Sequence, residues 1–203
     1  NTSIPRWINS FSNNCAAHIR IELINDGAIG LQEIFDIVND YMQQYQNIRY
    51  IKHKNRQQAL SKYAGIQASF GKYITFLDSD DTYKENHLQS RIAYMQSHLD
   101  VDLIEGGFFS EEEIFVLDYY QPDRTINLRE CVLGPTFFGK REVFFELKGF
   151  KTIFYGEDTD LWERAEKFFK TQKIRQPETY VYTRAETSVT KTFLDIAEIS
   201  KPV

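Results

Sequence analysis

The sequence predicts an α/β fold built on a mainly parallel, doubly wound sheet. Short apolar segments with the composition of buried strands alternate along the chain with segments of helical periodicity. This alternation is typical of parallel strands joined by helical crossovers. Turns that carry carboxylates directly follow two of the strand-like segments, at residues 25–27 and 78–81. Ligands bind at this carboxyl edge of an open α/β sheet, so we expect the functional site there.

Length and composition fit one globular domain over residues 1–203. Hydrophobic residues make up 42% of the chain, which is enough for a substantial core. The net charge of −5 gives no basic footprint, so we expect no nucleic-acid partner. Cys15 and Cys131 lack the paired spacing of a zinc site or a disulfide framework, and no apolar run reaches the roughly 20 residues of a membrane helix. We therefore expect a cytoplasmic protein whose contact with a membrane, at its inner face, is at most peripheral.

The first 52 residues predict two helices and two strands. Residues 1–14 have a helical apolar stripe, and the segment IRIELI at 19–24 predicts a strand that runs directly into the turn at 25–27. An amphipathic helix is expected over 31–45 and a short strand over 47–52. The order strand, helix, strand is that of a parallel crossover unit.

The segment at 73–77 predicts a buried central strand, because its apolar residues lack helical spacing and Gly71 precedes it. A helix over 57–70 completes the crossover that leads into this strand. After the acidic turn, Asp81 or Thr82 is expected to cap a helix with Glu85 in its first turn. The apolar positions of that helix are Leu88, Ile92, Met95 and Leu99. A further strand is expected at 101–105.

Helical periodicity is weak between residues 108 and 140, where we expect a strand at 114–119 and loops elsewhere. A short helix is expected at 141–147, and a last strand at 180–183. Between them, a helix begins near residue 157 with an apolar stripe that predicts core packing. The stripe consists of Leu161, Trp162, Ala165, Phe168 and Phe169.

The acidic turn after the central strand contains Asp78, Asp80 and Asp81. Three like charges a few ångströms apart repel one another unless protons or a cation intervene. A hard divalent ion with oxygen ligands, Mn²⁺ or Mg²⁺, is the natural partner of such a cluster. A solvated loop with one capping carboxylate is the simpler alternative, but a cap needs only one of the three side chains.

Four segments together resemble family 2 inverting glycosyltransferases, which have the GT-A fold and use nucleotide sugars. INDG at 24–27 resembles the family's Asp-Asp-Gly-Ser turn, and GKYITFLDSDD at 71–81 resembles its Asp-x-Asp metal site. GEDTDLWERA at 156–165 resembles the segment that supplies the catalytic base, and LGPTFFGKREVFFELKGF at 133–150 resembles the segment before it. The resemblance implies a GT-A-like sheet and a role in bacterial polysaccharide assembly.

The resemblance implies a nucleoside-diphosphate sugar as the donor and assigns residues to it. Asp26 is expected to contact the nucleoside, and Lys62 stands where the family has an arginine. Asp78 is expected on the ribose side of the donor. Asp80 is the expected main ligand of Mn²⁺ or Mg²⁺, with Asp81 either a second ligand or a group behind it.

The resemblance also assigns the catalytic base. Asp158 is expected to take the proton of the acceptor hydroxyl, with Glu157 beside it acting through orientation or through the acceptor. Tyr155 and Trp162 would raise the pKa of Asp158 if they pack against it, because an apolar setting disfavours the charged carboxylate. A single displacement with this base inverts the anomeric centre.

In this interpretation the domain has two halves. Residues 1–107 form the nucleotide-sugar half, and residues 108–203 form the acceptor and catalytic-base half. The expected acceptor is a hydroxyl group of a glycan or of a lipid-linked molecule.

The chain departs from the family pattern in two places. The family opens with an apolar strand that ends in Pro-x-x-Asn and contacts the nucleotide, and this strand is not represented in the sequence. The family's late Tyr-Arg-x-His pattern has Ala185 where the histidine is expected. Arg184 or Lys191 could neutralise the diphosphate in its place.

Two other functions fit parts of the pattern. Residues 76–82 also resemble the Asp-x-Asp-x-Thr motif of haloacid dehalogenase-like phosphatases, with Asp78 as nucleophile and Asp80 as acid. Alternatively, the domain binds a nucleotide or a glycan without catalysis, a possibility raised by the unrepresented first strand.

Overall fold

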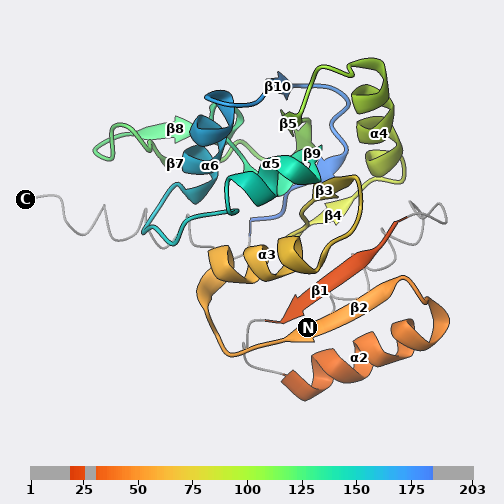
Figure 1. Cartoon of the computed structure of the whole chain (residues 1–203). Helices are drawn as coiled ribbons and strands as arrows, with labels where there is room; N and C mark the ends of the chain where they lie inside the picture. The colour runs from red at the N-terminus through yellow and green to blue at the C-terminus, as the bar shows by residue number, and fades with distance from the viewer. Residues whose placement is uncertain (1–18, 26–30, 185–203) are drawn as a thin grey trace, which may run out of the picture.

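The computed structural model describes residues 19–25 and 31–184, arranged as shown in Figure 1. In the first half, the expected alternation of strands and helices is confirmed. Its elements are β1 (Ile21–Asn25), α2 (Leu31–Gln44), β2 (Ile48–Lys52), α3 (Gln57–Ala68) and β3 (Tyr73–Thr75). The helix expected over residues 1–14 lies outside the described residues.

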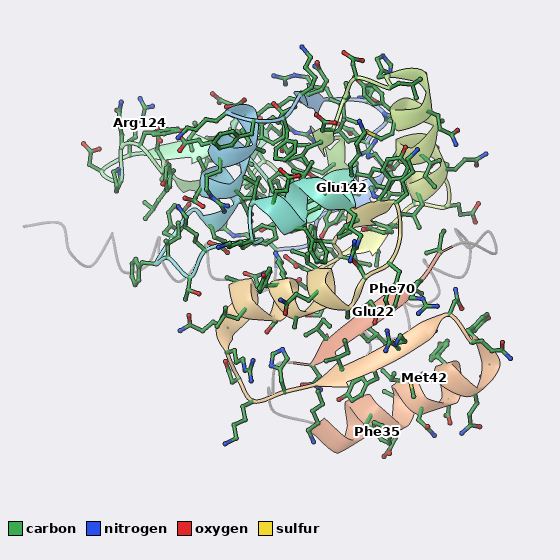
Figure 2. All side chains as sticks on the ribbon, in the orientation of Figure 1. Glu22, Phe35, Met42, Phe70, Arg124 and Glu142 are labelled. Atoms are coloured by element: carbon green, nitrogen blue, oxygen red, sulfur yellow. The ribbon has the colours of Figure 1, made fainter. Side chains whose placement is uncertain are left out.

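Strands β1 and β2 form a separate parallel pair, in which Ile21 is opposite Ile48. Ile21 and Leu23 are buried and alternate with half-buried residues, as expected for a strand with one face on the core. Helix α2 packs on this pair. The ring of Phe35 on α2, which is labelled in Figure 2, meets Tyr50 of β2 edge-on, with the ring centroids 5.6 Å apart.

A four-stranded sheet has the order β10-β5-β9-β3. Its further members are β5 (Leu103–Gly106), β9 (Phe138–Lys140) and β10 (Thr171–Ile174). Strands β5 and β10 are parallel, whereas β9 is antiparallel to both β3 and β5. The α/β class is confirmed, and β9 makes this sheet a mixed one.

Strand β3 is shorter than the expected segment 73–77, and it ends the four-stranded order instead of occupying its centre. Its pairing stops at Thr75, and the next side chain packs among aromatic rings. The ring of Phe76 meets Phe144 and Phe150 edge-on, each at a centroid distance of 5.3 Å. The acidic turn therefore starts from a short strand whose continuation is held by an aromatic cluster.

A cavity of about 1770 Å³ has both β1 and β3 in its wall. Among the described strands, β1 pairs only with β2, and β3 pairs only with β9. Helix α4 (His87–Ser97) contributes Leu88 and Ile92 to the cavity wall. In Figure 1, β1, β2 and α2 lie below the rest of the molecule, with α3 beside β1.

The remaining elements follow the acidic turn in the chain. They are the three-stranded set β4 (Thr82–Tyr83), β11 (Tyr180–Val181) and β6 (Phe108–Phe109), the hairpin β7 (Phe115–Leu117) and β8 (Thr125–Asn127), the 3-10 turns η1 (Leu128–Glu130) and η2 (Gly134–Thr136), and the helices α5 (Arg141–Glu146) and α6 (Glu157–Glu166).

Some predictions for this part of the chain were wrong. Strands β6, β8 and β9 form in the stretch 108–140, where loops were expected outside 114–119. The short strand β4 follows the acidic turn, so α4 begins at His87 and neither Asp81 nor Thr82 caps it. Helix α4 ends at Ser97, which leaves Leu99 75% exposed beyond it. Helix α6 ends at Glu166, which likewise leaves Phe168 76% exposed.

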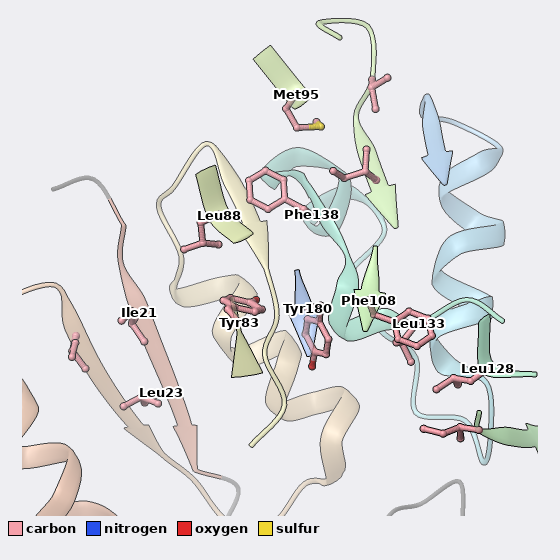
Figure 3. Close-up of a cluster of buried hydrophobic side chains, with 14 of the residues drawn as sticks. Ile21, Leu23, Tyr83, Leu88, Met95, Phe108, Leu128, Leu133, Phe138 and Tyr180 are labelled. Carbon is pink, nitrogen blue, oxygen red and sulfur yellow. The ribbon is translucent and has the colours of Figure 1, made fainter. Parts of the chain in front are cut away.

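The core consists of two clusters of buried apolar side chains. The first joins β1 and β2 to α4 and the second half, and Figure 3 shows Leu23, Leu88, Phe138 and Tyr180 within it. The second contains the α6 residues Leu161, Trp162 and Ala165, so the predicted core role of this helical stripe is confirmed for them. None of the helices in the described part of the chain is long and apolar enough to cross a bilayer.

Candidate active site

Asp78 and Lys62 form an ion pair in the cavity wall. The Lys62 Nζ lies 3.4 Å from Asp78 Oδ1, and Gln58 Nε2 donates a hydrogen bond to Asp78 Oδ2 at 3.3 Å. The Lys62 side chain is only 10% exposed, and its Nζ lies 5.1 Å from the centroid of the Phe150 ring. Helix α3 thus brings a shielded cation to the acidic turn, at the position where the family has an arginine.

Three carboxylates control the pKa of Lys62. Burial alone would lower this pKa, because it disfavours the ammonium form. The charges of Asp78, Asp158 and Glu157 outweigh burial and raise it. Lys62 is therefore a permanent cation that interacts with both acidic segments of the site.

Asp80 and Asp81 are neighbours in sequence but have opposite environments. Asp80 is exposed at the cavity, and desolvation, supported by the nearby charge of Asp78, raises its pKa. Asp81 is only 2% exposed, and both of its oxygens accept hydrogen bonds. Tyr180 Oη donates to Oδ2 at 2.5 Å, and the Thr183 amide donates to Oδ1 at 2.6 Å. Burial raises the pKa of Asp81 to about 7.

These environments decide how the turn could hold a cation. No three His, Cys, Asp or Glu side chains within residues 19–25 and 31–184 converge as a ligand set. Asp80 is accessible to an ion in the cavity, whereas Asp81 is already engaged by Tyr180 and Thr183. Mg²⁺ is commonly bound through one or two carboxylates together with substrate phosphates and water. Asp80 is the side chain of the turn that could hold an ion in this way.

Asp158 lies in the first turn of α6 and lines the same cavity as the acidic turn. The Gly134 amide donates a hydrogen bond to its Oδ2 at 2.9 Å. Its Oδ1 is shielded from solvent and has no hydrogen-bond partner within the described residues. Burial raises the pKa of Asp158 to about 7, against the opposing charge of Lys62. One carboxylate oxygen is thus fixed and the other is left to accept a proton.

Two glycines make this arrangement possible. Gly156 precedes α6 with φ of +80°, a conformation that residues with a side chain rarely adopt. At Gly134, a Cβ atom would collide with the Asp158 carboxylate. From the sequence, Gly134 was notable only as part of the family-like segment 133–150. Its hydrogen bond to Asp158 joins residues 24 positions apart, so no local sequence pattern predicts it.

The aromatic setting of Asp158 differs from the expected one. Tyr155 lines the cavity, and its hydroxyl donates to the Leu117 carbonyl at 2.8 Å. Trp162 faces the core, where its ring stacks on Phe137 at a centroid distance of 6.0 Å. Of the two predicted aromatic neighbours, Tyr155 is the one in the cavity wall.

The structure brings together the predicted residues that it describes. Lys62, Asp78, Asp80, Glu157 and Asp158 come from three segments of the chain and all line the same cavity. The predicted nucleoside contact Asp26 lies outside the described residues, as do Ala185 and Lys191.

Arg184 is a further candidate for binding an anionic ligand near the acidic turn. Its Nε and one terminal nitrogen are shielded from solvent and have no hydrogen-bond partner in the described part of the chain. It directly follows Thr183, which donates to Asp81. A guanidinium group can bind an anion such as a phosphate through several N–H donors at once.

Comparisons with known proteins identify a sequence family for the chain. The sequence model of glycosyl transferase family 2 matches residues 1–144. An uncharacterized glycosyltransferase of Methanocaldococcus jannaschii is 25% identical over 140 residues, which are 64% of this chain and 48% of that protein. An uncharacterized glycosyltransferase of Rickettsia bellii is 28% identical over 162 residues, which are 76% of this chain and 23% of that protein. The chain thus spans about half or less of these relatives.

Solved structures share the fold at low sequence identity. Residues 1–349 of S. aureus TarS in complex with UDP-GlcNAc match with a TM-score of 0.71 and 15% identity, over 95% of this chain and 57% of that chain. The mannosyltransferase PcManGT from Pyrobaculum calidifontis in complex with GDP-Man and Mn²⁺ matches with a TM-score of 0.69 and 12% identity, over 91% of this chain and 54% of that chain. The expected GT-A fold is confirmed.

The family assignment leaves the phosphatase interpretation of residues 76–82 without support. It rests on a match over more than half of the chain, and the motifs at 71–81 and at 133–144 lie within that match. The chain belongs to glycosyl transferase family 2.

Proposed function

We propose that this domain transfers a sugar from a nucleoside-diphosphate sugar to an acceptor hydroxyl, with inversion and with the help of a divalent ion. The observation that carries the proposal is the hydrogen bonding of the Asp158 carboxylate. One of its oxygens is held by the Gly134 amide, and the other has no partner within the described residues. The same cavity contains Asp80 and Lys62, which suit the charged end of a donor.

The donor occupies the side of the cavity formed by the acidic turn. Asp78 contacts the ribose and Asp26 the nucleoside, and Lys62 keeps Asp78 in place through their ion pair. Arg184 neutralises part of the diphosphate charge with the two nitrogens that have no hydrogen-bond partner among the described residues. The structural neighbours with UDP-GlcNAc and with GDP-Man support a donor of this class.

Asp80 would hold Mn²⁺ or Mg²⁺ together with phosphate oxygens of the donor. The ion would stabilise the charge that develops on the leaving diphosphate. Asp81 stays behind this site as a brace, because Tyr180 and Thr183 already occupy its oxygens. The PcManGT complex, which contains GDP-Man and Mn²⁺, supports the proposal that a divalent ion takes part in donor binding.

The reaction is a single displacement. The acceptor oxygen bonds to the anomeric carbon as its proton passes to Asp158 Oδ1, and the bond from that carbon to the β-phosphate oxygen breaks. The electron pair leaves with the nucleoside diphosphate, and attack from the opposite face inverts the anomeric centre. Glu157 acts on the orientation of Asp158 or of the acceptor, since it precedes the base in the first turn of α6.

The acceptor is a glycan or lipid-linked hydroxyl that enters from the side formed by residues 108–203, and residues 1–107 form the donor half. Polysaccharide assembly in the cytoplasm, at the inner face of the membrane, suits such an acceptor. Peripheral contact with the membrane is sufficient for this arrangement.

The test separates catalysis from donor binding. In Asp158→Asn, the amide keeps the shape of the side chain but cannot accept the proton, so transfer should fall about 10²- to 10⁴-fold. The affinities for the nucleotide and for Mn²⁺ should stay nearly unchanged. Glu157→Gln is the matched control and should reduce transfer much less.

Near-normal turnover of Asp158→Asn would place the base elsewhere. Loss of nucleotide binding instead of turnover would make the start of α6 part of the donor site. If the parent domain binds nucleotide with Mn²⁺ but transfers nothing to any acceptor, the non-catalytic alternative holds.

A further inference from the structure

Glu105 is a buried carboxylate that the proposed reaction does not use. It lies near the end of β5 and is only 4% exposed. Burying a carboxylate costs free energy unless it is hydrogen-bonded, and burial indeed raises its pKa. In the turn before η2, the Leu133 amide donates a hydrogen bond to Glu105 Oε1 at 3.1 Å, and the charges of Lys173, Arg175 and Arg91 also favour the carboxylate form.

A second pair of contacts holds the same turn to β5. The Gly106 amide donates to Thr136 Oγ1 at 2.9 Å, and Thr136 Oγ1 donates in turn to the Leu133 carbonyl at 2.6 Å. Thr136 is fully buried. Consecutive residues of a buried strand therefore hold both ends of the turn over residues 133–136.

The next amide of that turn holds the base. Leu133 donates to Glu105, and Gly134 donates to Asp158 Oδ2 at 2.9 Å. Two successive backbone amides thus bond two carboxylates from different elements. A shift of the turn relative to β5 would therefore move the amide that orients Asp158. The backbone of Gly134 packs closely against the Asp158 carboxylate, because a Cβ atom at this position would collide with it.

We propose that Glu105 is a positioning residue for Asp158, acting through the turn over residues 133–136. The proposal rests on the proposed function of Asp158 as the base. Glu105 and Thr136 fix the position of the turn relative to β5. The Gly134 amide of the same turn then fixes the orientation of the Asp158 carboxylate. The precision of a catalytic group depends on such supporting hydrogen bonds.

Two substitutions of Glu105 separate the hydrogen bond from packing and charge. In Glu105→Gln, a carbonyl oxygen can still accept from the Leu133 amide, although the charge is removed. In Glu105→Leu, the volume is similar but no acceptor remains, so a buried amide loses its partner. If Glu105 positions Asp158, the environment of Asp158 should be preserved in Glu105→Gln and disturbed in Glu105→Leu.

The readout is the titration of the Asp158 carboxyl group by ¹³C NMR, with its signal assigned by its loss in Asp158→Asn. The groups that face Asp158 are Lys62 on α3, Glu157 on α6 and Asp78 after β3. The Gly134 hydrogen bond favours the charged form of Asp158. Weakening that bond in Glu105→Leu should raise the titration midpoint by about 0.5 to 1 pH unit.

The Gln variant should titrate like the parent, and so should Glu112→Leu, which changes an exposed carboxylate. If Glu105→Leu does not fold, Thr136→Val takes its place, because it removes the hydroxyl that links Gly106 to Leu133. It should shift the midpoint in the same direction. A folded Glu105→Leu or Thr136→Val with the parent's midpoint overturns the proposal.

Nucleotide release from UDP-GlcNAc and from GDP-mannose with Mn²⁺ gives the catalytic readout. Glu105→Leu should lower kcat about 10-fold, with the donor KM within about 2-fold of the parent, because misplacing a reacting group costs turnover. Normal kcat together with a shifted midpoint would overturn the role in positioning. The proposed function fails separately, when Asp158→Asn keeps full turnover.

Discussion

At the scale of single residues, the site depends on carboxylates held in unfavourable surroundings. Asp158 and Asp81 both have pKa values raised to about 7 by burial, yet their partners give them different uses. Asp81 accepts two hydrogen bonds and braces the acidic turn. Asp158 accepts one from Gly134 and keeps an oxygen without a partner in the described part. Burial at Asp158 raises basicity near neutral pH, which suits a general base.

This basicity has a cost in stability that depends on pH. The pKa of Asp158 is about 7 in the folded protein, above the ordinary value of 3.8. Between these pH values the folded state holds a proton that the unfolded state releases, so its contribution to the free energy of unfolding is lost as pH rises. Asp158→Asn does not titrate. Its Tm advantage over the parent should therefore widen from pH 4 to pH 7 and level off above.

Thermal unfolding at several pH values measures this difference, with Asp123→Asn at an exposed position as the control. A constant Tm difference across the range would mean that Asp158 is not destabilised by burial. Transfer by the parent should rise over the same range, because the base acts in its deprotonated form.

The types of residue in the site could be predicted from the sequence, but their contacts could not. Carboxylates at a strand end pointed to Asp78 and Asp80, and the family resemblance pointed to Asp158. The different environments of Asp80 and Asp81 depend on Tyr180, which is 99 positions from Asp81. A hydrogen bond over that separation leaves no periodic or local pattern.

At the scale of elements, β11 and the residues after it hold the acidic turn through hydrogen bonds to Asp81. Tyr180 pairs with Tyr83 of β4 and with Phe108 of β6, while its hydroxyl donates to Asp81. The predicted helix cap at Asp81 failed because this carboxylate bonds Tyr180 and Thr183, and β4 separates it from α4. Tertiary contacts here override a local capping preference.

Tyr180→Phe tests this fastening. The strand pairing of β11 is made by the backbone and should survive, but Asp81 Oδ2 loses its donor. We expect a loss of about 1–3 kcal/mol in the free energy of unfolding, because a buried carboxylate oxygen is left unsatisfied. Urea denaturation measures it, and Tyr45→Phe at an exposed ring is the matched control. Equal stability of both variants would show that the hydroxyl does not hold the turn.

At the scale of the whole molecule, the cavity joins segments from both halves of the chain. Strand β1, the acidic turn and the start of α6 all contribute to its wall. The alternation of strands and helices was predictable because each element has its own period. The antiparallel insertion of β9 was not, since its three residues have no distinguishing pattern and their place depends on β3 and β5.

The central claim is that the cavity binds a nucleoside diphosphate through a divalent ion held by Asp80. Calorimetric titration with UDP, GDP, CDP and dTDP, with and without Mn²⁺, tests it on the parent domain and on Asp80→Ala, with Asp123→Ala as the control. We predict that one nucleotide binds at least about 10-fold more tightly with Mn²⁺, which corresponds to about 1.4 kcal/mol, and that Asp80→Ala alone loses this gain. Nucleotide and Mn²⁺ binding by Asp80→Ala as tight as that of the parent would contradict the account.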